Sequence, residues 1–431
     1  MALFGTDGVR GVAGEYLTAD LALALGRAAA LTSPADAPQV LIVRDTRESG
    51  EMLEAALAAG IAAGGGHALL GGVLPTPGAA VLVRRHGFDL AAVVSASHNP
   101  YRDNGIKFFG PEGTKIDDEQ EAEIERLHEP GSARIGRVRE LHGAGGDYLR
   151  ELELRFRDLD LSGRRVLLDC ANGATYRVAP EIFRRLGADV DAIAVEPDGR
   201  NINRDCGSTH VERLAERMAG QDVGFAFDGD GDRVLAVDRA GAVVDGDELM
   251  ALAALHLRRR GRLPGDGVAV TVMTNYGFHR AMEAAGIAVA TTPVGDRHVL
   301  AELLRRGWAL GGEQSGHIIE TAFVPAGDGI AAALLTLEAL GTGDLADRGA
   351  MEKLPQRLVN VRVADRDAIE GADEVWRAAR EESDRLRGRG RVLIRASGTE
   401  PLVRVMVEAP REEECEEIVG RLANLVEAKL G

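Results

Sequence analysis

Three carboxylates, Asp228, Asp230 and Asp232, alternate with glycines directly after an apolar run. Hard oxygen ligands of like charge on one short loop favour Mg²⁺ or Ca²⁺ over softer metals. A calcium loop of the EF-hand type is excluded, because its sixth position is Arg233 instead of glycine and its twelfth is Arg239 instead of glutamate. A solvated acidic turn is the alternative, but unneutralised carboxylates this close repel one another. The spacing therefore predicts a divalent-cation site.

Ser97 lies in a polar turn that follows another apolar run, and α/β folds present their chemistry at such strand ends. Lys107 follows in the sequence and supplies a positive charge of the kind that a phosphorylated serine needs; serine as a simple turn residue is the alternative. His98 is a candidate catalytic group, although its position next to Ser97 does not make a triad. Arg10, in a glycine-punctuated loop near the start, is a further candidate for oxyanion charge or a residue of a plain turn.

Two further loops contain side chains suited to binding a substrate. Glu313, Ser315 and His317 follow an apolar strand and suit the recognition of sugar hydroxyls. The second loop combines hydroxyls, a glycine and two guanidiniums, the groups that bind phosphate; its residues are Arg395, Ser397, Gly398, Thr399 and Arg404. A β-turn with surface arginines is the alternative for this loop. The connection at 71–77 is interpreted as structural and is assigned no chemistry.

The elements that must position these loops follow a repeated pattern. Apolar runs occur in pairs separated by helical periodicity, and the second run of each pair leads to one of the first three loops. The paired runs begin near residues 40 and 90, 165 and 222, and 268 and 307. This pattern predicts three similar α/β domains with mixed or parallel sheets, at 1–146 (serine loop), 147–246 (metal loop) and 247–354 (sugar loop). A strand, a charged helix, two strands and a final helix predict a smaller α+β domain with the phosphate loop at 355–431.

Composition restricts the partners. The formal net charge of −17 argues against a nucleic-acid partner. The longest uncharged stretch, 55–83, is interrupted by glycines and prolines, so no membrane span is expected, and the start lacks the basic residues of a signal peptide. We therefore expect a cytoplasmic protein. Its three cysteines have no metal-ligand spacing and are expected to be reduced, partly buried thiols.

Taken in order, the segments FGTDGVRG, SASHNPYRDNGIKFF, DGDGDR, GGEQSGH and RASGTEPLVRVM resemble the α-D-phosphohexomutase superfamily over essentially the whole chain. The resemblance implies that Ser97 is a phosphoserine and that Asp228, Asp230 and Asp232 hold one Mg²⁺ per chain together with the seryl phosphate. It implies that Glu313, Ser315 and His317 contact sugar hydroxyls, and that the phosphate loop binds the non-reacting phosphate. The C-terminal domain is expected to close a central cleft.

The closest resemblance is to the bacterial branch that interconverts glucosamine 6-phosphate and glucosamine 1-phosphate for amino-sugar nucleotide and cell-wall precursor synthesis. Such an intramolecular phosphotransferase, of the isomerase class, works through a 1,6-bisphosphate, and a hexose 1,6-bisphosphate is its expected activator. Lys107 and Arg10 are expected to manage protons and oxyanion charge. The alternatives are a phosphomannomutase or phosphoglucomutase of the same superfamily and a Mg²⁺-dependent sugar phosphatase. Asp296 stands where some relatives have histidine, so a histidine acid/base role is not transferred. The oligomeric state stays open.

Overall fold

A computed structural model describes residues 3–5, 7–126, 134–397 and 400–431. The chain forms two compact units, one of Met1–Val272 with Ala290–Arg348 and the other of Met273–Val289 with Gly349–Gly431. The described residues contain sheets of six, five, four and three strands. The predicted combination of α/β sheets with a smaller α+β tail is confirmed.

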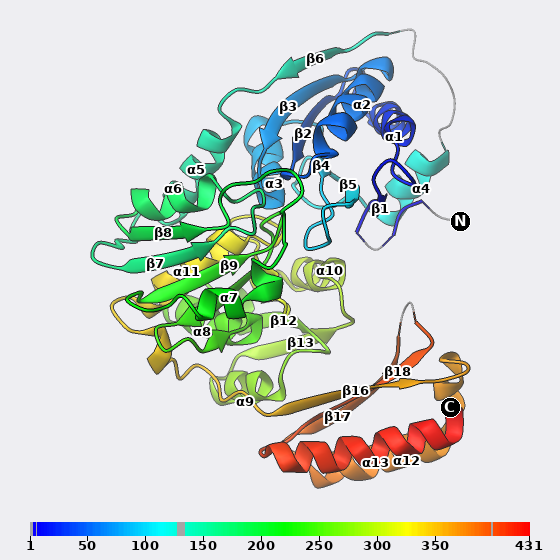
Figure 1. Cartoon of the computed structure of the whole chain (residues 1–431), viewed down its shortest axis with the longest axis vertical. Coiled ribbons are helices and arrows are strands. Elements are labelled where there is room, and N and C mark those ends of the chain that lie inside the picture. Colours follow the sequence, from blue (N-terminus) through cyan, green and yellow to red (C-terminus); the bar gives the residue numbers. More distant parts are fainter. Residues whose placement is uncertain (1–2, 6, 127–133, 398–399) are drawn as a thin grey trace. The chain divides into compact units, whose positions relative to one another are not determined.

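The first sheet has the order β1-β5-β4-β2-β3-β6, with β2, β3, β4 and β6 parallel and β1 and β5 antiparallel to their neighbours (Figure 1). Its strands are β1 (Val9–Val12), β2 (Gln39–Arg44), β3 (His67–Val73), β4 (Leu90–Val94), β5 (Asp103–Phe109) and β6 (Arg137–Glu140), and the helices of this part are α1 (Ala19–Thr32), α2 (Gly50–Ala63), α3 (Thr76–His86) and α4 (Asp118–Arg126). Thr18 caps α1 by accepting a hydrogen bond from the Leu21 amide. Helices α1 and α2 pack so closely that a Cβ on Gly26 would lie 2.3 Å from the Leu57 carbonyl oxygen.

The second and third sheets repeat this design. Their orders are β11-β10-β9-β7-β8 and β13-β12-β14-β15. The strands are β7 (Arg165–Asp169), β8 (Asp189–Ile193), β9 (Val223–Phe227), β10 (Val234–Asp238), β11 (Val243–Val244), β12 (Gly267–Thr271), β13 (Ala288–Thr292), β14 (Leu310–Gly312) and β15 (Ile318–Glu320). The helices are α5 (Ala144–Arg155), α6 (Val178–Arg185), α7 (Glu212–Ala215), α8 (Gly246–Arg259), α10 (Asp296–Arg306) and α11 (Gly329–Leu340), and the 3₁₀ turns are Ser208–His210, Pro264–Asp266 and Leu345–Asp347.

Each of these three sheets contains the same sequence of pairings. A parallel pair (β2 with β4, β7 with β9, β12 with β14) is followed by an antiparallel strand (β5, β10, β15). The predicted serine, metal and sugar loops are the three connections into these antiparallel strands, at 95–102, 228–233 and 313–317. The three strand pairs expected from the apolar runs are therefore confirmed as neighbouring parallel strands.

Buried polar contacts also join the elements around these loops. Asp328 caps α11 by accepting a hydrogen bond of 2.9 Å from the Ala331 amide, and its other oxygen accepts one of 2.8 Å from the Tyr148 hydroxyl on α5. Burial raises the pKa of Asp328 from 3.8 to about 6, even though these hydrogen bonds favour the charged form.

The second unit is built on an antiparallel sheet, β16-β18-β17, with two helices together on one side of it (Figure 1). Its elements are β16 (Gln356–Arg362), β17 (Arg391–Ala396), β18 (Leu402–Glu408), α12 (Asp373–Arg385), α13 (Glu412–Leu430) and the 3₁₀ turn Asp367–Gly371. Val403, Val405 and Val407 of β18 belong to its buried core. Helix α9 (Tyr276–Ala284) also lies in this unit, where the Tyr276 amide donates a hydrogen bond to Glu408.

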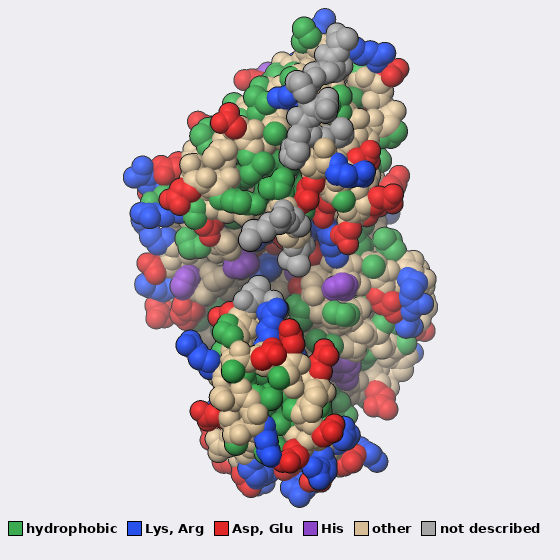
Figure 2. Space-filling view, turned by 90° about the vertical axis from the view of Figure 1, so that its right-hand side faces the viewer, with side chains coloured by type: hydrophobic (Ala, Val, Ile, Leu, Met, Phe, Trp, Pro, Cys, Tyr) green, Lys and Arg blue, Asp and Glu red, His purple; other side chains and the backbone are tan. Residues whose placement is uncertain are grey.

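The surface is of mixed charge. On the face shown in Figure 2, basic and acidic side chains lie interspersed. Cys170, Cys206 and Cys415 are free and buried, as expected. Among the described helices, none has both the length and the apolar character that a bilayer crossing requires.

Candidate active site

Ser97 lies in the loop between β4 and β5, with only 2% of its surface exposed. Its backbone is left-handed, with φ at 51°, a conformation that costs a non-glycine residue free energy. Its amide donates to Ser95 Oγ at 3.0 Å, and the Ser95 hydroxyl donates to Asp45 at 2.6 Å. The Ser97 hydroxyl donates to Asp228 Oδ2 at 2.5 Å. The structure thus brings together the serine loop and the metal loop, which the sequence separates by more than a hundred residues.

Asp228, Asp230 and Asp232 are buried, and ligand oxygens from all three lie within 4.8 Å of one another. Asp230 Oδ1 and Asp232 Oδ1 are buried with no hydrogen-bond partner among the described residues. Buried carboxylate oxygens are normally satisfied, and apart from Arg233 Nε at 3.9 Å from Asp232 Oδ1, these two oxygens are open to a cation. The cluster therefore fits a hard divalent cation, whose preferred ligands are carboxylate oxygens.

The pKa values of Asp228 and Asp232 are shifted in opposite directions. Burial, and then the charges of Asp232 and Asp230, raise the pKa of Asp228 well above its usual value. Burial would also raise the pKa of Asp232, but His317 and Lys107 outweigh it and hold that pKa well below its usual value. Without a cation, Asp228 therefore favours the protonated form and Asp232 favours the ionised form.

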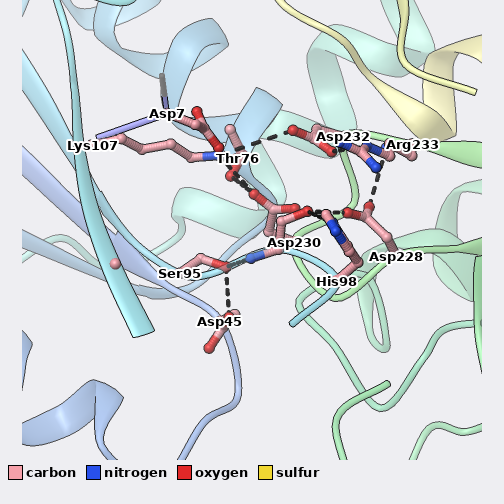
Figure 3. A network of polar contacts seen from close by, with 12 residues as sticks. Asp7, Asp45, Thr76, Ser95, His98, Lys107, Asp228, Asp230, Asp232 and Arg233 are labelled. Atoms are coloured by element: carbon pink, nitrogen blue, oxygen red, sulfur yellow. Dashed lines mark hydrogen bonds and ion pairs between the residues drawn. The ribbon is translucent and has the colours of Figure 1, made fainter. Parts of the chain in front are cut away.

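Lys107 is buried and its ammonium lies 2.8 Å from Asp230 Oδ2 (Figure 3). The antiparallel pairing of β4 with β5 places Lys107 opposite Val93, next to the start of the serine loop. Burial alone would lower the pKa of Lys107, but the carboxylates of Asp230, Asp7 and Asp232 raise it above its usual value. Lys107 is therefore a fixed positive charge beside the metal cluster.

Thr76 is a site residue that the sequence interpretation missed. The connection at 71–77 was expected to carry no chemistry, yet the Thr76 hydroxyl donates to Asp230 Oδ2 at 2.5 Å and its amide donates to the Asp230 carbonyl at 2.9 Å (Figure 3). Thr76 begins α3, directly after the β3 connection. The available signal was its position shortly after the end of a strand, as for the other loops, although here the connection leads to a helix.

Arg10 lies beside Asp7, forming an ion pair with its carboxylate and donating from Nε to its carbonyl at 3.2 Å. Lys115 pairs with Asp7 and, at 2.5 Å, with Asp296. Burial would raise the pKa of Asp296, but Lys115 and then His317 lower it, so Asp296 is an ionised carboxylate. The sequence interpretation included neither Asp7 nor Lys115 among the site residues.

His98 Nδ1 lies 3.3 Å from Ser97 Oγ. Burial and then the charges of Arg233 and Arg10 lower the pKa of His98, which favours the neutral imidazole. No carboxylate hydrogen-bonds the His98 ring among the residues that the structure describes.

The third loop lines a cavity together with residues of the first two loops. Glu313 accepts a hydrogen bond of 3.1 Å from the Gly295 amide, and His317 lies 3.6 Å from Asp232 and 3.9 Å from Asp296. Burial would lower the pKa of His317, but Asp232 raises it above its usual value. A cavity of about 700 Å³ is lined by groups from all three sheets, including Asp7, Arg10, His98, Asp232, Arg233, Glu313 and His317. Ser315 is exposed on this loop and is not among the residues that line the cavity.

In the second unit, Arg395 on β17 lies directly opposite Arg404 on β18. Burial and the charge of Arg404 lower the pKa of Arg395, and like charges opposite each other destabilise a sheet unless an anion lies between them. Ser397 Oγ lies 3.5 Å from Arg404 Nη2, and its carbonyl accepts 2.8 Å from Arg366, a residue the sequence interpretation missed. Gly398 and Thr399 lie outside the described residues. The guanidiniums of Arg395 and Arg404 and the hydroxyl of Ser397 are groups that suit the binding of a phosphate.

Four family descriptions match consecutive segments of the chain. They are the phosphoglucomutase/phosphomannomutase α/β/α domains I (1–134), II (146–241) and III (245–358) and the C-terminal domain (358–425). The chain belongs to the phosphoglucomutase/phosphomannomutase family. The resemblance to phosphohexomutases is therefore confirmed, and with it the expected enzyme class, an intramolecular phosphotransferase.

Curated relatives in this family are similar over nearly their whole length. A phosphoglucosamine mutase of Moorella thermoacetica is 51% identical, covering 97% of this chain and 98% of the relative. A phosphoglucosamine mutase of Geobacillus kaustophilus is 47% identical, covering 99% of both chains.

Solved structures of the family share the fold. A phosphoglucomutase/phosphomannomutase family protein from Burkholderia thailandensis has a TM-score of 0.84 at 26% identity, covering 99% of this chain and 97% of the other. An N-acetylphosphoglucosamine mutase of Aspergillus fumigatus, solved with GlcNAc-6P and magnesium, has a TM-score of 0.67 at 19% identity, covering 99% of this chain and 95% of that one.

Proposed function

We propose that this enzyme interconverts glucosamine 6-phosphate and glucosamine 1-phosphate through a phosphorylated Ser97 and a hexose 1,6-bisphosphate. The observation that carries the proposal is the Ser97 hydroxyl, 2.5 Å from Asp228 at the edge of the three-aspartate cluster. A serine there can carry a phosphoryl group next to a bound cation. The choice of sugar rests on relatives of 47–51% identity that are named phosphoglucosamine mutases.

In the forward direction, the bond between phosphorus and Ser97 Oγ breaks while phosphorus bonds to O1 of the sugar, whose hydroxyl loses its proton. The resulting 1,6-bisphosphate turns end for end, and the 6-phosphoryl group returns to Ser97. Lys107, fixed beside Asp230, supplies positive charge at the metal cluster while the leaving Ser97 oxygen becomes negative, and Arg10 lines the cavity that His98 and Asp232 also line, where it can meet the transferring oxygens. His98 Nδ1, neutral and 3.3 Å from Ser97 Oγ, is placed to exchange a proton there.

One Mg²⁺ per chain fits the cluster and would be held by Asp228, Asp230 and Asp232 together with the seryl phosphate. It would neutralise charge that develops on the transferred phosphoryl group. The Oδ1 atoms of Asp230 and Asp232, which accept no hydrogen bond among the described residues, would be available to it as ligands.

Substrate recognition is divided between two loops. Glu313, Ser315 and His317 contact sugar hydroxyls, and Arg395, Ser397 and Arg404, with Gly398 and Thr399, bind the phosphate that is not transferred. The opposed guanidiniums of the second unit support this assignment, because an anion between them relieves their repulsion. The three boundaries between the four domains, at 146, 246 and 354, belong to the same proposal.

The test is the activity of Ser97→Ala together with the intact mass of the wild type. We expect mutase turnover to fall by about three orders of magnitude or more, since a covalent carrier has no substitute. The wild type should carry one phosphoryl group after incubation with a hexose 1,6-bisphosphate, and Ser97→Ala none. Ser162→Ala, an exposed turn serine far along the chain, is the control and should keep full activity. Full turnover by Ser97→Ala refutes the phosphoserine.

The sugar preference is tested by comparing kcat/KM for the 6-phosphates of glucosamine, glucose and mannose, each assayed with its 1,6-bisphosphate. Glucosamine 6-phosphate should give the highest value. A higher value for mannose or glucose 6-phosphate would place the enzyme in another branch of the family with the mechanism unchanged, and release of free phosphate without sugar 1-phosphate would indicate a phosphatase.

A further inference from the structure

The backbone carbonyl of Ser97 accepts two hydrogen bonds from side chains that the mechanism above does not use. Arg47 Nη2 donates at 2.9 Å and Asn203 Nδ2 donates at 2.8 Å. Arg47 follows β2 of the first sheet, whereas Asn203 lies between β8 and β9 of the second. The serine is therefore held from both sides of the boundary between two sheets.

Arg47 donates hydrogen bonds to several carbonyls of the serine loop. Arg47 is 1% exposed, and its guanidinium pairs with Asp45 at 2.8 Å and also donates to the carbonyls of Asn99 and Asp103, each at 2.9 Å. A buried guanidinium requires its donors to be satisfied, and here Asp45 and the carbonyls around the serine loop satisfy them. The loop can therefore adopt only a conformation that presents those carbonyls to Arg47.

Asn203 connects this loop to the metal loop. It is buried, its φ is 56°, and its amide also donates to the Asn99 carbonyl at 3.2 Å. A Cβ on Gly229 would lie 2.5 Å from the Ser97 carbonyl oxygen and 2.7 Å from Asn203 Nδ2. Gly229 stands between Asp228 and Asp230, so the serine loop, the metal loop and Asn203 touch at a single point where no larger residue fits.

We infer that Asn203, together with Arg47, is a positioning residue for phosphoryl transfer: by holding the Ser97 carbonyl it keeps the serine in its left-handed conformation, with Oγ directed at Asp228 and the cation. The inference rests on the proposed phosphoserine mechanism. Ser95 Oγ holds the Ser97 amide, while Arg47 and Asn203 hold its carbonyl, so the peptide planes on both sides of Ser97 are held and with them the direction of Cβ. Released from the carbonyl, Ser97 relaxes towards an ordinary conformation and Oγ moves away from its partner.

Asn203→Gly tests this without disturbing the backbone, because glycine adopts a φ of 56° more readily than asparagine does. Asn203→Asp keeps the shape but turns acceptor oxygens towards the two carbonyls. Asp205→Gly is the matched control: Asp205 is exposed, has a φ of 54° in the same segment, and makes no hydrogen bond to the serine loop in the described part of the chain.

The rate at which glucose 1,6-bisphosphate phosphorylates Ser97 in the full chain is followed by intact mass, and kcat and KM are measured for glucosamine 6-phosphate. We expect Asn203→Gly to lower the phosphorylation rate and kcat by about 10-fold to 100-fold, with KM changed by less than about 2-fold. Asn203→Asp should lose more, and Asp205→Gly should match the wild type. Melting temperatures of Asn203→Gly and the wild type should be similar.

Wild-type phosphorylation rate and kcat in Asn203→Gly would overturn the inference. It would also be overturned if both Asn203 variants lost activity only in proportion to a lowered melting temperature, or if KM rose while the phosphorylation rate held, because those results indicate general support or substrate contact. Failure of the wild type itself to be phosphorylated would instead refute the proposed mechanism, so the two failures are distinguishable.

Discussion

Thr76→Val removes one hydroxyl from the metal cluster and changes almost nothing else in shape. The Thr76 hydroxyl and the Lys107 ammonium both donate to Asp230 Oδ2, at 2.5 Å and 2.8 Å, which leaves Asp230 Oδ1 directed away and without a partner. The two donors therefore determine which oxygen of Asp230 is available to a cation. With only Lys107 left, the carboxylate can rotate about its own axis, and the free oxygen is no longer fixed.

The expected size follows from the kind of bond that is lost. A hydrogen bond to a charged acceptor contributes about 1.5–3 kcal/mol, and partners that orient a metal ligand alter metal affinity by about 10-fold to 100-fold when removed. Because the Lys107 pairing persists in Thr76→Val, Asp230 stays charged and the cluster stays assembled. We therefore expect the Mg²⁺ concentration for half-maximal activity to rise by about 10-fold to 100-fold, with kcat at saturating Mg²⁺ reduced less.

The assay is a Mg²⁺ titration of mutase turnover, after chelation, for the wild type, Thr76→Val and Thr76→Ser. Thr76→Ser keeps the hydroxyl and should remain within about 3-fold of the wild type. Thr336→Val is the control for losing a buried threonine hydroxyl elsewhere, since Thr336 donates to the Ala332 carbonyl at 2.9 Å inside α11. It should cost stability and leave the Mg²⁺ requirement unchanged.

A Thr76→Val enzyme with the wild-type Mg²⁺ requirement would show that Lys107 alone orients Asp230. An equal rise in Thr336→Val would show that the effect reflects lost stability and not ligand geometry. Either result would refute the reasoning.

Three further changes test other parts of the structure. Asp230→Asn should raise the Mg²⁺ requirement at least about 10-fold and lower the melting temperature, since Lys107 loses the charged partner 2.8 Å away; Mg²⁺ titration and thermal unfolding measure both. Because folding raises the pKa of Asp328 from 3.8 to about 6, the folded state holds a proton that the unfolded state releases, so wild-type stability relative to Asp328→Asn should fall by about 2 kcal/mol as the pH rises from about 4 to 7. Urea unfolding of both proteins at the two pH values checks this, and parallel curves would contradict it. Arg404→Gln should raise KM for glucosamine 6-phosphate by about 10-fold or more while the protein stays folded, and an unchanged KM would remove Arg404 from the phosphate site.

The sequence predicted the parts of the site that follow from local pattern. Apolar runs predicted the strand pairs β2 with β4, β7 with β9 and β12 with β14, because strands buried on both faces read as continuous apolar segments. The aspartates at alternating positions indicated a cation site because their chemistry is contained in one short loop. The structure places Ser97, Lys107 and the aspartates together as their chemistry requires, although their catalytic roles remain predictions.

The residues that the sequence did not indicate act across the fold. Thr76 approaches Asp230 only because α3 begins beside the metal loop, and Asn203 reaches Ser97 only because two loops of different sheets touch at Gly229. Nothing in the local sequence of either residue distinguishes it from an ordinary helix start or turn. Their roles depend on distances between segments more than a hundred residues apart, which pattern and propensity do not determine. The domain boundaries likewise stay predictions.

The three loops that enter antiparallel strands differ in length, running from 95 to 102, from 228 to 233 and from 313 to 317, while the strands on either side pair in the same way. The hydrophobic pattern of buried strands specifies their register, so connections of different length can join strands that pair in the same way. The residues of each connection can therefore change without changing the sheet around it, and here one connection carries Ser97, one the three aspartates and one Glu313 with His317. If the proposed roles hold, exchanging only the 313–317 connection between relatives is the smallest graft that should transfer sugar preference while the chemical step stays with the other two connections.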